Sequence, residues 1–111
     1  MPVIRVEVPA GTQQAIRVAV KAAVLKETKY DYVAVREVVG EIGDGVPLVE
    51  IDLRPGRESE RKKALVDAIA DILHDTMGVA AADIYALFRE NPAENHYCGG
   101  EPLAAWVPAD T

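Results

Sequence analysis

The spacing of apolar residues predicts four strands along the chain. Alternation of apolar and polar positions predicts strands over residues 2–9 and 31–39. A mostly alternating segment over residues 48–53 predicts a central strand, and residues 83–89 complete the set as the fourth. The main strands therefore fall into two pairs. Within each pair, the two strands are separated by a segment long enough for a helix.

Two segments between these strands predict helices. Residues 58–77 have an amphipathic pattern that ends at Gly78, the position of a C-terminal cap. The expected apolar face of this helix consists of Leu65, Ala68, Ile69, Ile72 and Leu73. Residues 13–27 are rich in Ala, Gln and Lys, which favour helix. Apolar residues cover so much of this first helix that we expect it to be nearly enclosed.

The openings of the two strand pairs are alike in sequence. Pro2 and Gly11 bracket the first strand, and Pro47 and Gly56 bracket the central strand 45 positions later. The apolar positions between them also match in type. This internal similarity indicates that the chain contains two copies of one unit.

Two β-α-β units joined side by side predict an α+β fold. Because each crossover is right-handed, the product is one four-stranded sheet with both helices on one face. We expect a single domain over residues 1–111, with repeat units 2–45 and 47–107. The apolar residues of the uncovered sheet face need another subunit to bury them, so we expect a homotrimer.

The C-terminal residues are expected to take part in this assembly. We predict a short strand near Leu103 to Val107 that closes an edge or reaches a neighbouring subunit. Trp106, the only tryptophan, is expected at or near the subunit interface.

Composition narrows the class of protein. A chain of 111 residues with 50% apolar and 27% charged residues is typical of one soluble globular domain. No apolar run is long enough for a bilayer and no signal peptide pattern opens the chain, so we expect no membrane partner and a cytoplasmic location. A single cysteine agrees with a reducing compartment. The net charge of −6 argues against nucleic acid as a partner.

Two arginines at the end of the central strand are the clearest candidates for binding. Arg54 and Arg57 lie three positions apart where strand becomes helix. A cation near a helix N-terminus opposes the macrodipole, whereas a guanidinium fork suits a carboxylate. We therefore expect a small carboxylate substrate. Two isolated histidines do not supply a metal site, and we expect no metal and no cofactor.

The chain resembles the tautomerase superfamily. Pro47 through Arg57, the helix that follows and the segment His96-Tyr97-Cys98-Gly99-Gly100-Glu101 are similar to a monomer of 4-oxalocrotonate tautomerase. The two-unit length and the segments Leu53-Arg54-Pro55-Gly56-Arg57 and Phe88-Arg89-Glu90-Asn91-Pro92-Ala93 are closer to the fused members. These include cis-3-chloroacrylic acid dehalogenase, malonate semialdehyde decarboxylase and, at fold level, macrophage migration inhibitory factor.

The resemblance implies roles for particular residues. Pro2 would become an N-terminal secondary amine after removal of the initiator methionine and act as general base. Arg54 and Arg57 would match the paired carboxylate-binding arginines of the dehalogenase. We interpret Tyr97 as a wall of the pocket. Cys98 stands where the dehalogenase has its water-activating glutamate, which counts against water addition.

Two classes of function follow from these residues. The first is a tautomerase-like isomerase that moves a proton on a small 2-oxo or 2-hydroxyenoate acid, with Pro2, Arg54 and Arg57 as the catalytic residues. The second is a catalytically silent tautomerase-fold subunit that serves assembly or binding. Within the enzyme class, a decarboxylase or hydratase of the fused family stays open.

Overall fold

The computed structural model describes residues 2–28 and 32–107 of the chain. Its main elements are β1 (Val3–Pro9), α1 (Gln14–Thr28), β2 (Tyr32–Val38), β3 (Leu48–Leu53), α2 (Ser59–Met77) and β4 (Tyr85–Glu90). All six begin and end within two residues of the predicted positions. Residue 31, the predicted start of the second strand, lies outside the described residues.

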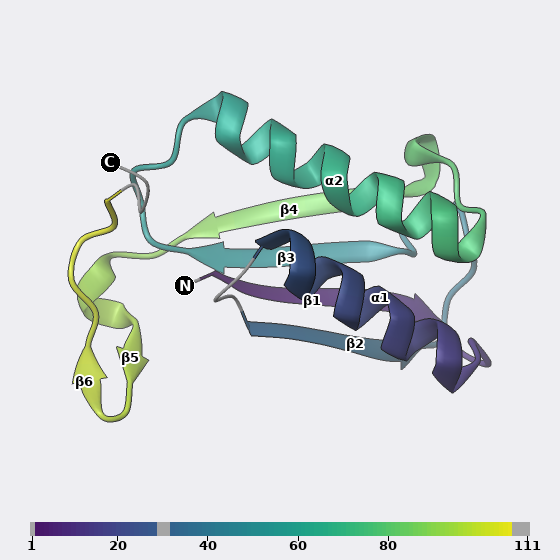
Figure 1. Cartoon of the computed structure of the whole chain (residues 1–111), viewed down its shortest axis with the longest axis horizontal. Helices are drawn as coiled ribbons and strands as arrows, with labels where there is room; N and C mark the ends of the chain where they lie inside the picture. Colours follow the sequence, from purple (N-terminus) through teal and green to yellow (C-terminus); the bar gives the residue numbers. More distant parts are fainter. Residues whose placement is uncertain (1, 29–31, 108–111) are drawn as a thin grey trace.

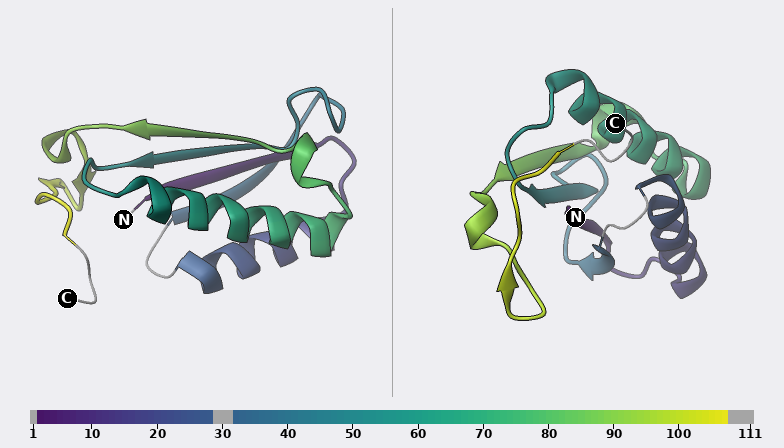
Figure 2. Two further views of the ribbon diagram at one scale, coloured as in Figure 1. Left: turned by 90° about the horizontal axis from the view of Figure 1, so that it is seen from above. Right: turned by 60° about the vertical axis from the view of Figure 1, so that its left-hand side comes forward.

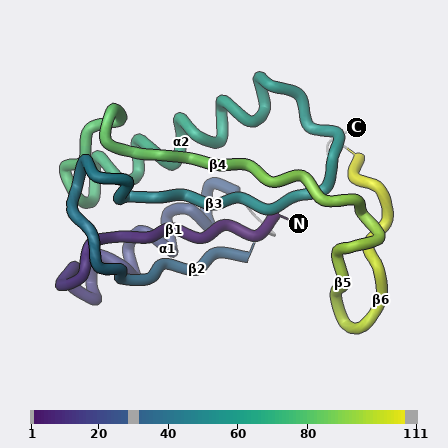
Figure 3. The backbone as a smooth tube through the Cα atoms, turned by 180° about the vertical axis from the view of Figure 1, so that it is seen from behind, coloured from purple at the N-terminus to yellow at the C-terminus, as the bar shows by residue number. Residues whose placement is uncertain are grey.

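The four strands form one mixed sheet in the order β2-β1-β3-β4. β1 is parallel to β2 and β3 is parallel to β4, while β1 and β3 pair antiparallel at the centre. Both helices lie side by side on one face, as Figure 1 and the left view of Figure 2 show, and Figure 3 shows the uncovered face from behind. The predicted α+β arrangement of two β-α-β units is confirmed. No described helix is long and apolar enough to cross a bilayer.

The two units begin with the same backbone contact. The Tyr32 amide donates to the Pro2 carbonyl oxygen over 3.1 Å, and the Tyr85 amide donates to the Pro47 carbonyl oxygen over the same distance. Both prolines are buried. The sequence similarity between the two openings thus has a structural counterpart.

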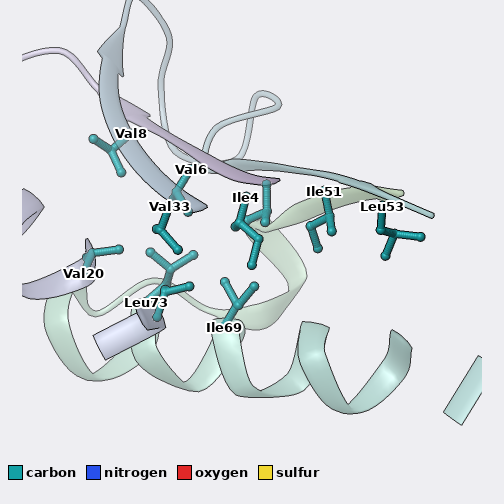
Figure 4. Packing of buried hydrophobic residues seen from close by; sticks show 11 residues of the cluster. Ile4, Val6, Val8, Val20, Val33, Ile51, Leu53, Ile69 and Leu73 are labelled. Atoms are coloured by element: carbon teal, nitrogen blue, oxygen red, sulfur yellow. The ribbon is translucent and has the colours of Figure 1, made fainter. Parts of the chain in front are cut away.

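The core lies between the helices and the sheet (Figure 4). Every second residue of β1 and β3 points into it, because side chains alternate between the two faces of a strand. The labelled members of this cluster are Ile4, Val6, Val8, Val20, Val33, Ile51, Leu53, Ile69 and Leu73. On the predicted apolar face of α2, Ile69 and Leu73 are buried, and Leu65 and Ile72 pack against the cluster, so four of its five residues are confirmed. Gly78 ends α2 in the left-handed conformation, and its amide donates to the His74 carbonyl oxygen over 2.8 Å.

The expectation that α1 is nearly enclosed is wrong. Only Val20 and Val24 of this helix are buried, whereas Val18 is 58% exposed and Leu25 is 36% exposed. One face of α1 packs on the sheet and on α2, and the small alanines elsewhere on the helix need no cover.

The uncovered sheet face also differs from the expectation. Its centre is charged rather than apolar, with Arg5 and Glu7 on β1 and Glu50 and Asp52 on β3. These side chains form ion pairs among themselves and with the outer strands, including Arg89 of β4. Exposed apolar or aromatic groups of this face lie on the outer strands, namely Tyr32, Tyr85 and Leu87. A covering subunit would therefore bury apolar and aromatic groups of the outer strands rather than of the central ones.

The predicted strand near Leu103 to Val107 is also wrong. Residues 103–107 form no strand, and the short pairing occurs earlier, between β5 (Tyr97–Cys98) and β6 (Glu101–Pro102). The left-handed Gly99 and Gly100 make this tight hairpin possible, because glycine adopts positive φ without a steric cost. The hairpin projects from one end of the sheet in Figure 1.

We predict that Leu73→Ala destabilises the protein far more than Leu25→Ala. Leu73 is fully buried between α2 and the sheet, so its truncation leaves a cavity and costs about 2–5 kcal/mol. The same substitution at the partly exposed Leu25 removes little packing. Urea unfolding of the two variants measures the difference, and equal losses would contradict this description of the core.

Candidate functional site

The strand directions bring the starts of two strands and the ends of the other two to the same end of the sheet. β1 and β2 begin there, whereas β3 and β4 end there, because β3 runs antiparallel to β1. The register pairs Val3 with both Tyr32 and Asp52. This end therefore collects the start of the chain and the junction that contains the two candidate arginines.

Pro2 lies immediately outside the register of the central strand pair. Because Val3 is opposite Asp52, the next step places Pro2 beside Leu53, the last residue of β3. Pro2 is buried, and its carbonyl oxygen accepts the Tyr32 amide. A base at this position would be shielded from water and would lie next to the residues that precede Arg54.

Asp52 is the electrostatic centre of this end of the sheet. Its carboxylate accepts Arg5 over 2.8 Å and Arg89 over 2.9 Å, and Asn91 approaches it at 3.5 Å. The hydrogen bonds from Arg89 are the largest cause that holds the pKa of Asp52 well below its usual range. Together with the hydrogen bond from Arg5, they outweigh the opposing effect of burial. The same contacts with Asp52 and Glu50 raise the pKa of Arg89. Strands β1, β3 and β4 are thereby linked through one carboxylate.

The two candidate arginines lie at the junction from β3 to α2. Arg54 donates from Nη1 to the Ala104 carbonyl oxygen over 2.6 Å. Arg57 donates from Nη1 to the Arg54 carbonyl oxygen over 3.2 Å. Both side chains are half-buried. The structure therefore places both residues at one junction, and it holds each guanidinium by a contact to the backbone.

Trp106 contacts this junction, which the sequence did not indicate. The Arg57 guanidinium carbon lies 4.4 Å from the centre of the Trp106 ring, and that of Arg61 lies 5.3 Å away. Gly56 has a φ of 125°, and a Cβ there would come within 3.1 Å of the ring. The close approach of Trp106 thus depends on glycine at this turn. The expected position of Trp106 at a subunit interface stays a prediction.

Tyr32 is a second residue at this end that the sequence analysis did not single out. Its hydroxyl oxygen lies 3.6 Å from the Cys98 sulfur, a contact between β2 and the hairpin. This hydrogen bond, followed by the electrostatic interaction with Cys98, raises the pKa of Tyr32. Cys98 is thus in contact with a tyrosine side chain. The His96 Nε2 atom is buried without a hydrogen-bond partner among the described residues.

Tyr97 lies on the projecting hairpin. Its side chain is 66% exposed, so the subunit itself does not enclose it. The interpretation of Tyr97 as a wall of the pocket stays a prediction. The described part of the chain also contains no group of three or more His, Cys, Asp or Glu side chains that could hold a metal ion.

The second unit matches a known family. A model for tautomerase enzymes matches residues 47–105, which begin at Pro47 and include both candidate arginines. The chain belongs to the tautomerase superfamily. No curated protein matches this tautomerase-family chain.

Solved structures of the superfamily share the whole fold. A fused 4-OT that forms an asymmetric trimer has a TM-score of 0.76 at 16% identity, with 90% of this chain and 94% of that chain covered. N1, a member of the cis-3-chloroacrylic acid dehalogenase family, has a TM-score of 0.73 at 22% identity, with 93% of this chain and 84% of that chain covered. A macrophage migration inhibitory factor-like protein from Entamoeba histolytica has a TM-score of 0.69 at 18% identity, with 92% of this chain and 98% of that chain covered. At these identities, the likeness establishes the tautomerase fold.

We predict that Asp52→Asn lowers the free energy of unfolding at neutral pH and reduces its dependence on pH in the acid range. The pKa of Asp52 is lowered on folding, so its contribution is complete above the unfolded value of about 4 and is lost as the pH falls below it. At neutral pH the substitution should lower the free energy of unfolding by about 1–2 kcal/mol. The loss is modest because water screens the partly exposed arginines.

Urea unfolding between pH 3 and pH 7 measures this dependence. Asp67→Asn is the matched control, since Asp67 pairs with Lys63 on the exposed face of α2. If the Asp52→Asn and Asp67→Asn variants lose the same stability and show the same pH dependence, Asp52 is not the electrostatic centre described above.

Proposed function

We propose that the protein is a tautomerase-like isomerase that moves a proton on a small 2-oxo or 2-hydroxyenoate acid. Pro2 is the general base, and Arg54 and Arg57 bind the substrate carboxylate. The observation that supports this proposal is the β1–β3 register, in which Pro2 adjoins the strand end that leads into both arginines. Family membership supports a tautomerase-like or related activity.

The reaction requires a free amine at Pro2. Removal of Met1 would convert the amide nitrogen of Pro2 into a secondary amine. In the proposed step, the neutral amine accepts the proton of the substrate 2-hydroxyl group, and the O–H electrons form the C=O bond. The C=C π electrons then take the proton back from the prolinium nitrogen at carbon. The substrate is isomerised without a net change in atoms or electrons, and no metal or cofactor is needed.

The surroundings of Pro2 suit a base that works near neutral pH. An ordinary α-amino group has a pKa near 8, and burial or a nearby positive charge lowers it because both disfavour the protonated form. Pro2 is buried, and Arg54 follows the residue beside it. A guanidinium held at this junction would also stabilise the negative charge that develops on the enolate oxygen.

We extend the proposal to the whole chain. Units 2–45 and 47–107 act as a single tautomerase-like domain, which assembles as a cytoplasmic homotrimer. Fused 4-OT structures of similar fold are asymmetric or symmetric trimers. Tyr97, exposed on the hairpin, then contributes a wall of the substrate pocket. The proposed partners of the protein are a small carboxylate substrate and other copies of the chain.

A catalytically silent subunit is the second candidate. It is favoured by the contact between Arg54 and the Ala104 carbonyl oxygen, because an arginine with a backbone partner can be purely structural. A decarboxylase or hydratase is a further candidate within the enzyme class, since malonate semialdehyde decarboxylase has a similar fold, with a TM-score of 0.63. The mass of the purified chain separates the first two, because a silent subunit has no need to lose Met1.

We predict an ordering of activity that depends on the nitrogen of Pro2. The processed wild type should turn over a 2-hydroxyenoate faster than processed Pro2→Ala, which keeps a primary amine at nearly the same place. Processed Pro2→Ala should in turn exceed a form that retains Met1, because an amide nitrogen does not accept a proton. Initial rates on chains of verified mass measure the ordering. Equal rates for the processed chain and the Met1-retaining form would rule out the proline mechanism.

A further inference from the structure

The closing segment, residues 103–106, contacts both candidate arginines. Its start is fixed to the chain by the Leu103 amide, which donates to the His96 carbonyl oxygen over 2.8 Å. The Ala104 carbonyl oxygen then accepts Arg54 over 2.6 Å. Two residues later, the Trp106 ring lies 4.4 Å from the Arg57 guanidinium carbon. One short stretch of chain therefore engages the whole pair.

The position of Arg57 calls for such support. It lies two residues before α2 begins, where the positive end of the helix macrodipole repels a cation. The negative face of an indole ring offsets this repulsion, since cation–π attraction is strongest for tryptophan. The Arg54 carbonyl oxygen further orients the Arg57 side chain, at 3.2 Å from Nη1. The guanidinium of Arg57 thus lies over the Trp106 ring and also donates from one nitrogen to the backbone.

Stacking on Trp106 is compatible with carboxylate binding. A ring engages the flat face of a guanidinium, whereas a carboxylate engages the N–H groups at its edge. A cation–π contact through the ring face can therefore orient the guanidinium without itself occupying the N–H groups. Gly56 supports the same geometry, because a Cβ at that position would press on the ring at 3.1 Å.

We propose that Trp106 is a positioning residue that orients the Arg57 guanidinium for recognition of the substrate carboxylate. The closing segment thereby forms part of the substrate-binding apparatus. The inference rests on the proposed function in that it assigns Arg57 to carboxylate binding. It adds a residue that touches the arginine and acts through it.

Fumarate, an unreactive planar carboxylate, tests this inference without any turnover. Calorimetric titration should show that Trp106→Ala weakens fumarate binding by roughly 3- to 30-fold, the range that a lost cation–π contact implies. Trp106→Phe keeps an aromatic face and should recover part of the loss. Val107→Ala is the matched control, because Val107 is 70% exposed and adjoins the closing segment. Thermal unfolding verifies that each variant is folded.

A double-substitution experiment separates positioning from general damage. If Trp106 acts through Arg57, Trp106→Ala should have little further effect on fumarate affinity in an Arg57→Ala background. Where turnover is measurable, Trp106→Ala should raise KM more than it lowers kcat. Trp106-dependent fumarate binding without turnover would support the inference and reject the proposed isomerase.

The opposite outcomes overturn the inference. A folded Trp106→Ala variant with wild-type fumarate affinity would show that the stack does not position Arg57, even if the enzyme turns over a 2-hydroxyenoate. Equal losses from Trp106→Ala with and without Arg57 would show that Trp106 acts independently of this arginine. Absence of fumarate binding by the wild-type chain would remove the carboxylate site itself.

Discussion

The antiparallel pairing of β1 with β3 determines where Pro2 and the junction with the two candidate arginines lie. It joins the two β-α-β units at the centre of the sheet, and it turns the start of one strand toward the end of the other. Pro2 and the junction that contains Arg54 lie at the same end of the sheet only because the units are related in this way. Asp52 reinforces the pairing there, since its carboxylate accepts Arg5 from β1 and Arg89 from β4. A parallel arrangement would have separated the proline from both arginines by the length of the sheet.

Local patterns were sufficient to predict the elements and the unit that they repeat. The alternating residues of β1 and β3 and the apolar stripe of α2 follow the periodicities of a strand and a helix. Gly78 marked the end of α2 because few other residues adopt its left-handed conformation. The junction with Arg54 and Arg57 was also recognisable, because the two residues are close in sequence and flank a turn.

Contacts between distant segments were not predictable in this way. Trp106 meets Arg57 across 49 positions, and no periodicity reports such a contact. Tyr32 meets Cys98 for the same reason, through the sheet order and the hairpin. The predicted strand near Leu103 to Val107 failed because the left-handed glycines close the hairpin earlier. The charged centre of the open face was overlooked because the apolar side of each strand dominated the interpretation.

The central proposal is that Pro2, once Met1 is removed, supplies a neutral secondary amine at a buried position beside the strand end that leads into Arg54 and Arg57. Its most direct test is the titration of the Pro2 nitrogen by NMR on purified protein labelled with ¹⁵N-proline. The account predicts an amine resonance whose pKa lies below the ordinary α-amino value of about 8, because burial and nearby arginines disfavour the protonated form. An amide resonance that does not titrate, or an amine with a pKa at or above about 8, would contradict it.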